Sequence, residues 1–421
     1  MAKRTKIRII PLIILFVIVA FVVVTGIRMA TLDTSLSITN AYEFPVLPEL
    51  SDLSDANFGQ QAVAIDGKIV YSKNNIGAPV MPIASTVKII LALSVMEKKP
   101  FNLGEKGEII VISDENYTDY TKYVAINGST TPVSIGEKYS EYDALALVLM
   151  ASSNNMADTL ASWAFGSIDS YHDFAMQMLE SWGISDIHFG TDASGYDVAT
   201  TGSAKSMAII AERLMLQPVL VEIVGRIEYN VENVGIISNT NKLLGVDRIS
   251  GVKTGFNGDS YSGYCLISSY LEPFTNMDNN VGADSIGANN HVVTIALLGA
   301  PTRTLSFADS QAIVETIQSA YIPIELTKTG VTVGTVDAWW VDKTDVIADG
   351  NVSLRGYKGQ ETSAKLQLNI TDDNSAQTIS GSIELQIDDE KQSTPVKTAK
   401  PIKTSPNLWE RFLHVFGWSK N

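Results

Sequence analysis

One serine and one lysine in the sequence have a spacing that suits nucleophilic catalysis. In Ala84-Ser85-Thr86-Val87-Lys88 they lie at positions i and i+3. At the start of a helix this spacing places both side chains on one face, about one turn apart. A serine hydroxyl needs a base to become a nucleophile, and a lysine can be that base if burial or a neighbouring cation lowers its pKa. The helix N-terminus would also offer free N–H groups to a developing oxyanion.

A single Ser-x-x-Lys match is a weak indication, because serine is also a common helix N-cap. The chain contains a second match in Ser250-Gly251-Val252-Lys253. That segment is predicted to be a strand, in which residues i and i+3 point to opposite faces. Ser85 is therefore the better candidate nucleophile.

Two further short motifs follow Ser85 in the chain. Ser152-Ser153-Asn154-Asn155 comes after a helical pattern over residues 143–151, and Lys253-Thr254-Gly255 precedes a predicted strand. The order SxxK, SxN and KTG is the set of motifs found in β-lactamases and penicillin-binding proteins. A second Lys-Thr-Gly at Lys328-Thr329-Gly330 lies past the last helix of this region and is interpreted as unrelated to the site.

With these motifs in order, the chain resembles the low-molecular-mass penicillin-binding proteins, the serine-type D-alanyl-D-alanine carboxypeptidases. The likeness runs from about residue 58 to residue 322 and favours Ser152 with Asn154 over Ser153 with Asn155. It extends to the following segments: Pro82 to Lys88, Gly136-Glu137-Lys138-Tyr139, Met156-Ala157-Asp158, Thr191 to Gly195, Asn239 to Gly245, and Gly251 to Phe256.

The resemblance implies a catalytic role for four residues. Ser85 would attack the carbonyl of the penultimate D-alanine, and Lys88 would take its proton. Ser152 would relay a proton to the departing amine, and Asn154 would bond the substrate amide and help to hold Lys88. Water would then hydrolyse the acyl-enzyme.

It also implies a substrate-binding set of Lys253, Thr254, Gly255 and Phe256. Lys253 and Thr254 would bind the terminal carboxylate of a peptidoglycan stem peptide ending in D-Ala-D-Ala. Lys253 would also supply the positive field that lowers the pKa of Lys88, and the N–H groups of Ser85 and Phe256 would form the oxyanion hole. β-Lactam antibiotics would be covalent inhibitors, and no metal or other cofactor is expected.

Two other functions fit parts of the pattern. A serine β-lactamase of the common class uses a glutamate downstream of the second motif, and no Glu-x-x-x-Asn occurs between Asn154 and Lys253. A catalytically silent wall-binding or penicillin-sensing protein would not need the complete motifs. The motifs do not say whether water or an amine accepts the acyl group, so a transpeptidase or endopeptidase stays open.

The elements that position these residues alternate between strands and helices. Residues 61–73 are predicted to form a hairpin around Asp66-Gly67. Strands are also expected at 264–268 and 291–298, with a long surface hairpin loop over 276–290 between them. Helices are predicted at 85–97, 142–164, 170–182, 203–216 and 307–320. The expected fold is α/β: a β-lactamase/penicillin-binding-protein-like sandwich, with an antiparallel sheet, helices on both faces and a helical subdomain.

Downstream of this region, residues 323–390 alternate polar and apolar side chains and are predicted to form a small all-β domain. The remaining expected parts are a membrane segment (1–30), a linker (31–58), the catalytic domain (59–322), a second linker (391–406) and an amphipathic C-terminal segment (407–421). Leu408, Trp409, Phe412, Val415 and Phe416 share one helical face. That face is predicted either to contact the membrane interface or to dock on the β domain.

The N-terminus is expected to place the protein at the cell membrane. Residues 9–27 are apolar and, at about 1.5 Å each, span roughly the thickness of a bilayer's hydrocarbon core. Lys3, Arg4, Lys6 and Arg8 precede them, so the N-terminus would stay in the cytoplasm and the catalytic domain would lie on the extracytoplasmic side. A retained anchor is favoured over a cleaved signal peptide.

The chain outside the membrane segment is strongly acidic. The whole chain has a net charge of −15, and its first thirty residues contribute +5, so the remainder carries −20. This charge argues against nucleic acid as a partner.

Overall fold

The computed structural model describes residues 9–50, 53–54, 56–258, 263–273, 290–320, 323–371, 373–388 and 390–418. They divide into two compact units. One is Glu49–Ile322, and the other combines Met1–Pro48 with Pro323–Asn421. The candidate site residues all belong to the first unit.

In the described part of Glu49–Ile322, the main sheet has five antiparallel strands in the order β10-β11-β12-β2-β3. Their bounds are β2 (Gln60–Ile65), β3 (Lys68–Asn74), β10 (Ile249–Phe256), β11 (Tyr264–Pro273) and β12 (Asn290–Ala300). The predicted hairpin is confirmed, with Asp66 and Gly67 both at positive φ in the turn between β2 and β3. Most of the loop expected over 276–290 lies outside the described residues.

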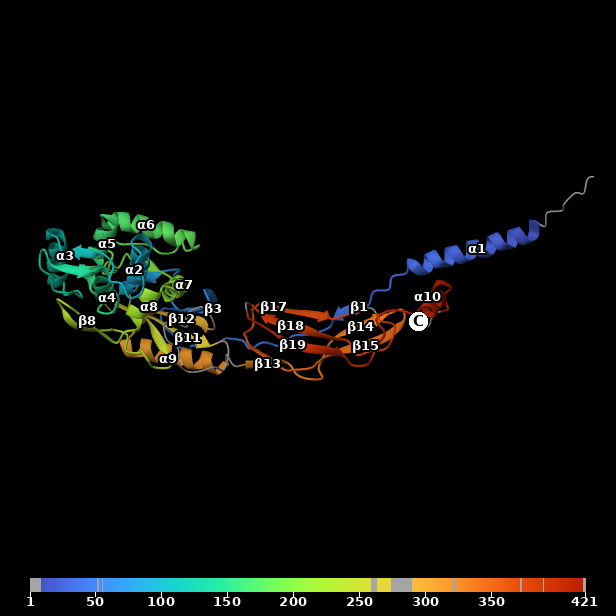
Figure 1. The fold of residues 1–421 in the computed structure, drawn as a ribbon. Helices are drawn as coiled ribbons and strands as arrows, with labels where there is room; N and C mark the ends of the chain where they lie inside the picture. The colour runs from blue at the N-terminus through green and yellow to red at the C-terminus, as the bar shows by residue number, and fades with distance from the viewer. Residues whose placement is uncertain are drawn as a thin grey trace, which may run out of the picture. The chain divides into compact units, whose positions relative to one another are not determined.

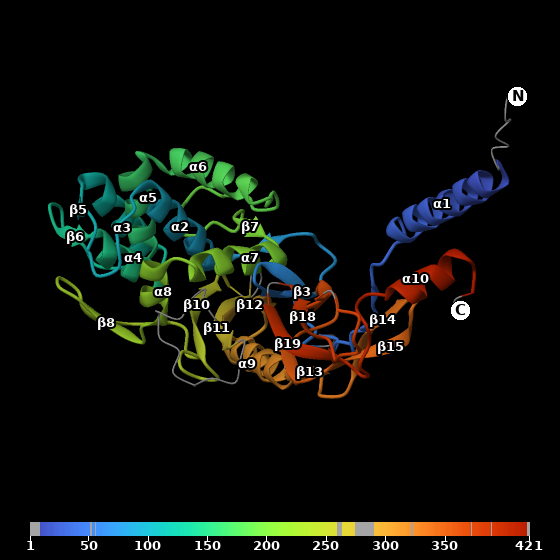
Figure 2. The ribbon, with the colours of Figure 1, turned by 45° about the vertical axis from the view of Figure 1, so that its right-hand side comes forward.

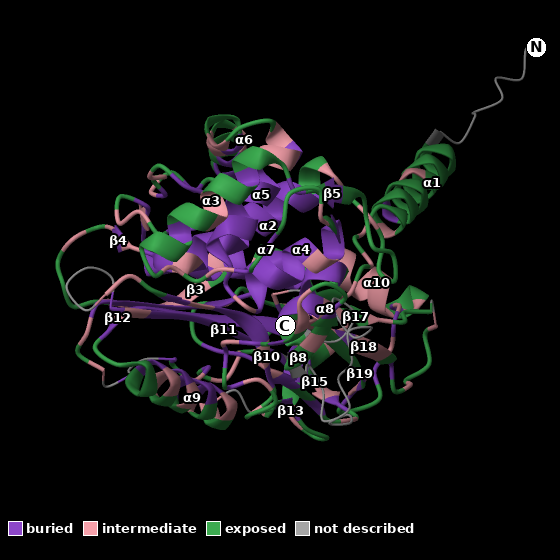
Figure 3. Cartoon of the chain, turned by 90° about the vertical axis from the view of Figure 1, so that its left-hand side faces the viewer, coloured by how far each residue is buried: buried purple, intermediate pink, exposed green. Residues whose placement is uncertain are grey.

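Helices cover both faces of this sheet (Figure 3). Helix α7 (Ala204–Met215) lies on one face, where Thr294 Oγ1 of β12 donates to the Ala208 carbonyl at 2.9 Å. Helix α9 (Arg303–Ala320) lies on the other, where Ser310 Oγ donates to Ser268 Oγ of β11 at 2.8 Å. The predicted sandwich is therefore confirmed.

A helical region packs beside the sheet, and α2, α4 and α5 lie together at its centre (Figure 2). Helix α2 is buried from Lys88 to Met96, because its sequence is apolar on nearly every side. The helical elements here are η1 (Ala84–Val87), α2 (Lys88–Lys98), α3 (Asp114–Ala125), α4 (Glu141–Leu149), α5 (Asn154–Phe165), α6 (Ile168–Ser181) and α8 (Pro218–Gly225). The short strand pairs are β4 (Met81–Pro82) with β7 (Thr201–Gly202), β5 (Ile109–Val111) with β6 (Lys138–Ser140), and β8 (Glu228–Val231) with β9 (Gly235–Ser238).

The prediction of one helix over 142–164 is wrong. Helix α4 ends at Leu149 and α5 begins at Asn154, with Ser152 at φ +63° between them. A left-handed residue cannot continue a right-handed helix. Helix α3 was not predicted, because its polar sequence lacks a clear apolar stripe.

The other unit is built on an antiparallel sheet with the strand order β1-β14-β15-β19-β18-β17 among its described residues (Figure 1). The six strands are β1 (Ser37–Asn40), β14 (Thr332–Ala338), β15 (Val341–Ala348), β17 (Thr362–Leu368), β18 (Ser380–Ile387) and β19 (Glu390–Thr398). Strand β13 (Pro323–Thr327) pairs separately with β16 (Val352–Arg355). The predicted all-β character is confirmed.

Both predicted linkers contain strands, which corrects two domain boundaries. Strand β1 lies within the expected linker 31–58 and pairs with β14 at the sheet edge. Strand β19 lies almost wholly within the expected linker 391–406 and pairs with β18 and β15. The first segment is rich in Ser and Asp and the second in Lys and Thr, and both compositions resemble those of linkers. The alternating burial of Thr394, Val396 and Thr398, however, fits a half-buried strand.

Two further helices belong to this unit. Helix α1 (Ile9–Ala30) is long and apolar enough to cross a membrane, by length and composition. Helix α10 (Leu408–Val415) contacts the β domain through His414, which stacks on Trp339 with ring centroids 4.0 Å apart. Leu408 and Trp409 stay 75% and 65% exposed. Helix α10 thus docks on the β domain, which was one of its two predicted roles, and it leaves Leu408 and Trp409 uncovered.

Candidate active site

Ser85 lies on a tight turn that leads into the central helix. It belongs to the 3₁₀ helix η1, which continues directly into α2 at Lys88. The N-cap positions are Ile83 for η1 and Val87 for α2, and neither makes a side-chain cap. Ser85 is therefore not a helix N-cap, which was the alternative role that its sequence context allowed.

Glycines allow two other segments to come close to this turn. A Cβ on Gly255 of β10 would lie 3.1 Å from the Ser85 backbone nitrogen. A Cβ on Gly195 would lie 2.2 Å from the Ala84 carbonyl oxygen, and Gly195 has φ +72°. Only glycine fits such an approach without displacing the backbone.

Lys88 is fully buried, and its ammonium group has three close partners. Its Nζ lies 2.8 Å from Ser85 Oγ, 2.8 Å from Asn154 Oδ1 and 2.8 Å from the Ser194 carbonyl oxygen. The 3₁₀ turn followed by α2 therefore brings Ser85 and Lys88 together, as their spacing predicts.

Ser152 and Asn154 lie at the break between α4 and α5. Lys253 Nζ donates to Ser152 Oγ at 2.9 Å, and Asn154 accepts from Lys88. In the other register, Ser153 Oγ donates to Asn155 Oδ1, and the Asn155 amide bonds the backbone of Thr131. The first pair thus faces the lysines, while the second joins the start of α5 to the loop that contains Thr131.

Strand β10 brings Lys253 to the site from the open edge of the sheet. Lys253-Thr254-Gly255 was predicted to precede a strand, but in the structure it lies within β10. Lys253 Nζ also donates to the Thr254 carbonyl at 2.9 Å, and Thr254 Oγ1 donates to Thr240 Oγ1 at 2.7 Å. The second Lys-Thr-Gly begins at Lys328, which is exposed in the β-domain unit beside Glu325.

The electrostatics of the two lysines differ from the expectation. Burial lowers the pKa of Lys88 to about 7, and the charges of Asp192 and Asp158 partly offset that effect. Burial, together with the charge on Lys88, holds the pKa of Lys253 well below its usual range. Desolvation, rather than the field of Lys253, is therefore the main reason why Lys88 can be neutral near pH 7.

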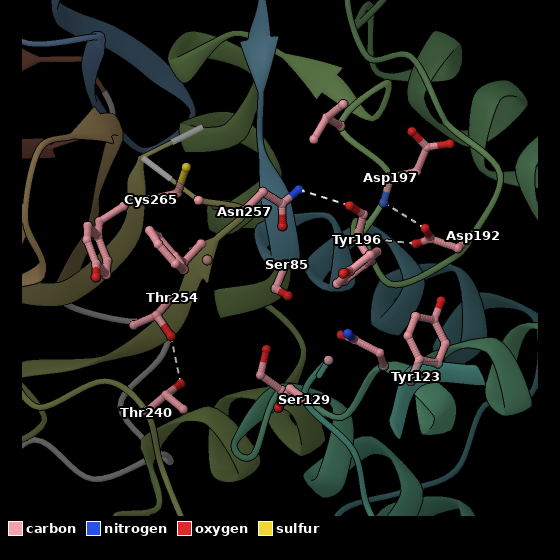
Figure 4. Close-up of a pocket in the computed structure, with 18 of the residues that line it drawn as sticks. Ser85, Tyr123, Ser129, Asp192, Tyr196, Asp197, Thr240, Thr254, Asn257 and Cys265 are labelled. Atoms are coloured by element: carbon pink, nitrogen blue, oxygen red, sulfur yellow. Dashed lines mark hydrogen bonds between the residues drawn. The ribbon is translucent and has the colours of Figure 1, made fainter. Parts of the chain in front are cut away.

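These residues open into a pocket of about 800 Å³. Ser85 lies in it between Thr254 and Tyr123 (Figure 4). Ser152, Asn154, Thr254, Gly255 and Phe256 also line it, and Phe256 stacks on Tyr264 with ring centroids 4.3 Å apart. All eight predicted site residues thus lie in or directly behind one cavity. The pocket can hold a peptide end against a serine that has a neutralisable lysine beside it.

Comparison with known proteins agrees with this geometry. A sequence model described as D-alanyl-D-alanine carboxypeptidase matches residues 56–280, more than half of the chain. The chain belongs to the D-alanyl-D-alanine carboxypeptidase family. It is therefore a serine-type D-Ala-D-Ala carboxypeptidase, a hydrolase of the penicillin-binding type. No curated protein sequence matches it.

Solved structures share the carboxypeptidase's fold at low sequence identity. A peptidoglycan synthesis regulatory factor (PBP3) from Streptococcus pneumoniae is 19% identical with a TM-score of 0.55, covering 82% of this chain and 99% of its own. Penicillin binding protein 5 from Haemophilus influenzae is 17% identical with a TM-score of 0.53, covering 82% and 98%. The Streptomyces K15 DD-transpeptidase is 20% identical with a TM-score of 0.50, covering 66% and 99%.

The carboxypeptidase site also contains residues that the sequence did not single out. Tyr123 of α3 lines the pocket and bonds Asp158 of α5, whose charge acts on Lys88. Asn257 Nδ2 donates to the Gly195 carbonyl at 2.7 Å. Asp158 was recognisable in principle, because it stands four residues after Asn154 on the same helical face. Tyr123 was not, because its place depends on the unpredicted helix α3.

Proposed function

We propose that Ser85 is the nucleophile of this carboxypeptidase and that Lys88 is its general base. The observation that carries the proposal is the 2.8 Å separation of Lys88 Nζ from Ser85 Oγ, on a lysine whose burial brings its pKa to about 7. A base with a pKa near the working pH is best suited to both accepting and returning a proton.

In the proposed acylation, neutral Lys88 takes the proton of Ser85 Oγ as that oxygen bonds the carbonyl carbon of the penultimate D-alanine. The N–H groups of Ser85 and Phe256 stabilise the resulting oxyanion. The C–N bond then breaks, and Ser152 relays the proton held by Lys88 to the nitrogen of the departing D-alanine, which leaves Lys88 neutral again. Water hydrolyses the Ser85 ester, which restores the hydroxyl and releases the shortened stem peptide.

Substrate recognition falls to strand β10 and to Asn154. Lys253 and Thr254 bind the terminal carboxylate, and Asn154 bonds the substrate amide while holding Lys88. Gly255 lets β10 approach the nucleophile closely, so that the peptide can contact both. A Cβ at this position would lie only 3.1 Å from the Ser85 nitrogen, which supports this role for a glycine. Phe256, 42% exposed, forms the outer wall. The proposed substrate class is a peptide that ends in D-Ala-D-Ala with a free C-terminal carboxylate.

β-Lactams are proposed as covalent inhibitors that acylate the same serine. The β-lactamase alternative predicts rapid turnover of nitrocefin, whereas a carboxypeptidase of this design forms a slowly hydrolysed stoichiometric adduct. The silent wall-binding alternative predicts no release of D-alanine at all.

The test is release of D-alanine from a peptide ending in D-Ala-D-Ala by the purified chain. Wild type is expected to release it, Ser85→Ala to release none, and Ser250→Ala, in the second Ser-x-x-Lys match, to behave like wild type. Activity in Ser85→Ala together with its loss in Ser250→Ala would overturn the assignment.

We further propose that α1 anchors the protein in the cell membrane, with the catalytic unit on the extracytoplasmic side. The exposed Leu408 and Trp409 of α10 make a second, interfacial contact, supported by the ring contact of Phe416 with Phe21 of α1 at 5.8 Å. Deletion of residues 1–30 is expected to release the protein from membranes only when Leu408 and Trp409 are also changed to serine. Release by the deletion alone would contradict the second contact.

A further inference from the structure

A buried polar cluster lies beside Lys88, and its member Tyr123 also lines the pocket that contains Ser85. Tyr123 OH donates to Asp158 Oδ2 at 2.7 Å, and the Ala193 N–H donates to Asp158 Oδ1 at 2.9 Å. Tyr123 OH also lies 3.3 Å from Ser194 Oγ. Asp158 thus joins helix α3, helix α5 and the loop that carries Ser194.

Helix α5 places this carboxylate in register with the site. Asn154 and Asp158 are four residues apart and therefore lie on one face of α5. Asn154 accepts a hydrogen bond from Lys88, and Asp158 stands one turn further along, 3% exposed. The same helix face therefore presents an amide to the lysine and a carboxylate behind it.

The loop over residues 192–197 is the other element that touches Lys88. The Ser194 carbonyl accepts from Lys88 Nζ at 2.8 Å. The side chain of Asp192 accepts from the backbone N–H groups of Ser194, Tyr196 and Asp197, which fixes the loop's own shape. Asp158 fixes where that loop lies relative to α5, through its bond to the Ala193 N–H.

We propose that Asp158 and Tyr123 are positioning residues for the base: they hold the Ser194 carbonyl against Lys88 and place a negative charge behind its ammonium group. The inference rests on the proposed role of Lys88 and deepens it. It explains why a tyrosine and an aspartate are buried together beside a catalytic lysine, where an apolar pair would pack without cost.

The charge at this position acts on Lys88 together with its neighbours. Asp158 and Asp192 both raise the pKa of Lys88 against the effect of burial. Burial raises the pKa of Asp158 itself, and the hydrogen bonds from Tyr123 and from the Ala193 N–H oppose that rise. The other ionisable groups near this cluster are Lys253 of β10, Asp119 of α3, and Tyr171 and His172 of α6. Because Asp158 favours the protonated lysine, removing its charge makes Lys88 neutral at lower pH.

The test is the pH dependence of acylation by a fluorescent penicillin, measured for Asp158→Asn in the full chain. The acid limb of the rate profile is expected to move about one unit to lower pH. Tyr123→Phe removes the bond that helps Asp158 stay ionised, so it is expected to move the limb in the same direction by less. A purely structural role would lower the rate at every pH and leave the limb in place.

The matched control is Asp186→Asn. Asp186 also accepts a side-chain bond, from Ser206 Oγ at 2.5 Å, but it is not among the groups that act on Lys88. This variant is expected to keep the wild-type limb. An unmoved limb in folded Asp158→Asn would overturn the inference, and if that variant does not fold, an unmoved limb in Tyr123→Phe does so instead. A wild-type chain that is not acylated at Ser85 would overturn the proposed function, a distinguishable result.

Discussion

The contact between Gly195 and the nucleophile turn allows a sharp test of how the site is held. In Gly195→Ala, the new Cβ would lie 2.2 Å from the Ala84 carbonyl oxygen and 2.7 Å from Val87 Cγ1. Neither the carbonyl nor Val87 can move without shifting η1. The loop that gives Lys88 its Ser194 acceptor and the turn that carries Ser85 would therefore be pushed apart.

Two costs add in this variant, and a control separates them. Alanine at φ +72° costs about 1–2 kcal/mol of unfolding free energy, and the overpacking costs about 1–3 kcal/mol more. Gly183, just after α6, has φ +75° with nothing within 4 Å of its Cβ position. Gly183→Ala therefore carries the first cost alone.

The assay compares urea unfolding with the rate of acylation by fluorescent penicillin. Gly195→Ala is expected to lose about 2–5 kcal/mol and to acylate about a hundredfold more slowly, because a shift of about 1 Å in a catalytic group has that effect. Gly183→Ala is expected to lose about 1–2 kcal/mol with an unchanged rate. Wild-type acylation in folded Gly195→Ala would refute the reasoning.

Three other predictions follow from the charges of the catalytic unit. The acylation rate of wild type is expected to rise about tenfold per pH unit up to about pH 7 and then level off, because protonated Lys88 cannot accept a proton; a flat profile in stopped-flow labelling would contradict this. Lys253→Ala is expected to lose about 10²–10³ in kcat/KM for a D-Ala-D-Ala peptide but much less for its C-terminal amide, whereas Lys328→Ala changes neither. Burial raises the pKa of Glu141 to about 7, so its folded form favours the proton and stability falls as pH rises from 4.5 to 7. Glu141→Gln is expected to remove about 1 kcal/mol of that loss in urea unfolding at pH 5 and pH 8, and an equal loss in both proteins would contradict it.

The sequence predicted the parts of the site that depend on local spacing. Ser85 and Lys88 are three residues apart, so one helical turn brings them together whatever surrounds them. The order of the three motifs then pointed to Ser152, Asn154 and Lys253. In the structure Ser152 and Asn154 line one pocket, and Lys253 lies directly behind it, bonded to Ser152.

The parts it missed depend on contacts between distant segments. The break before α5 follows from the left-handed conformation of Ser152, which an apolar helical pattern does not reveal. Burial of Lys88, the main cause of its lowered pKa, comes from packing of α2 among other helices. Strand β1 is polar and short, and pairing with β14, about 300 residues later in the chain, makes it a strand.

The assignment of Ser85 as nucleophile is tested most directly by mass spectrometry of the chain after incubation with penicillin and digestion. The account predicts one penicilloyl adduct, on the peptide that contains Ser85, and its absence in Ser85→Ala. An adduct on Ser152 or Ser250, or no adduct on a chain that still releases D-alanine, would contradict it.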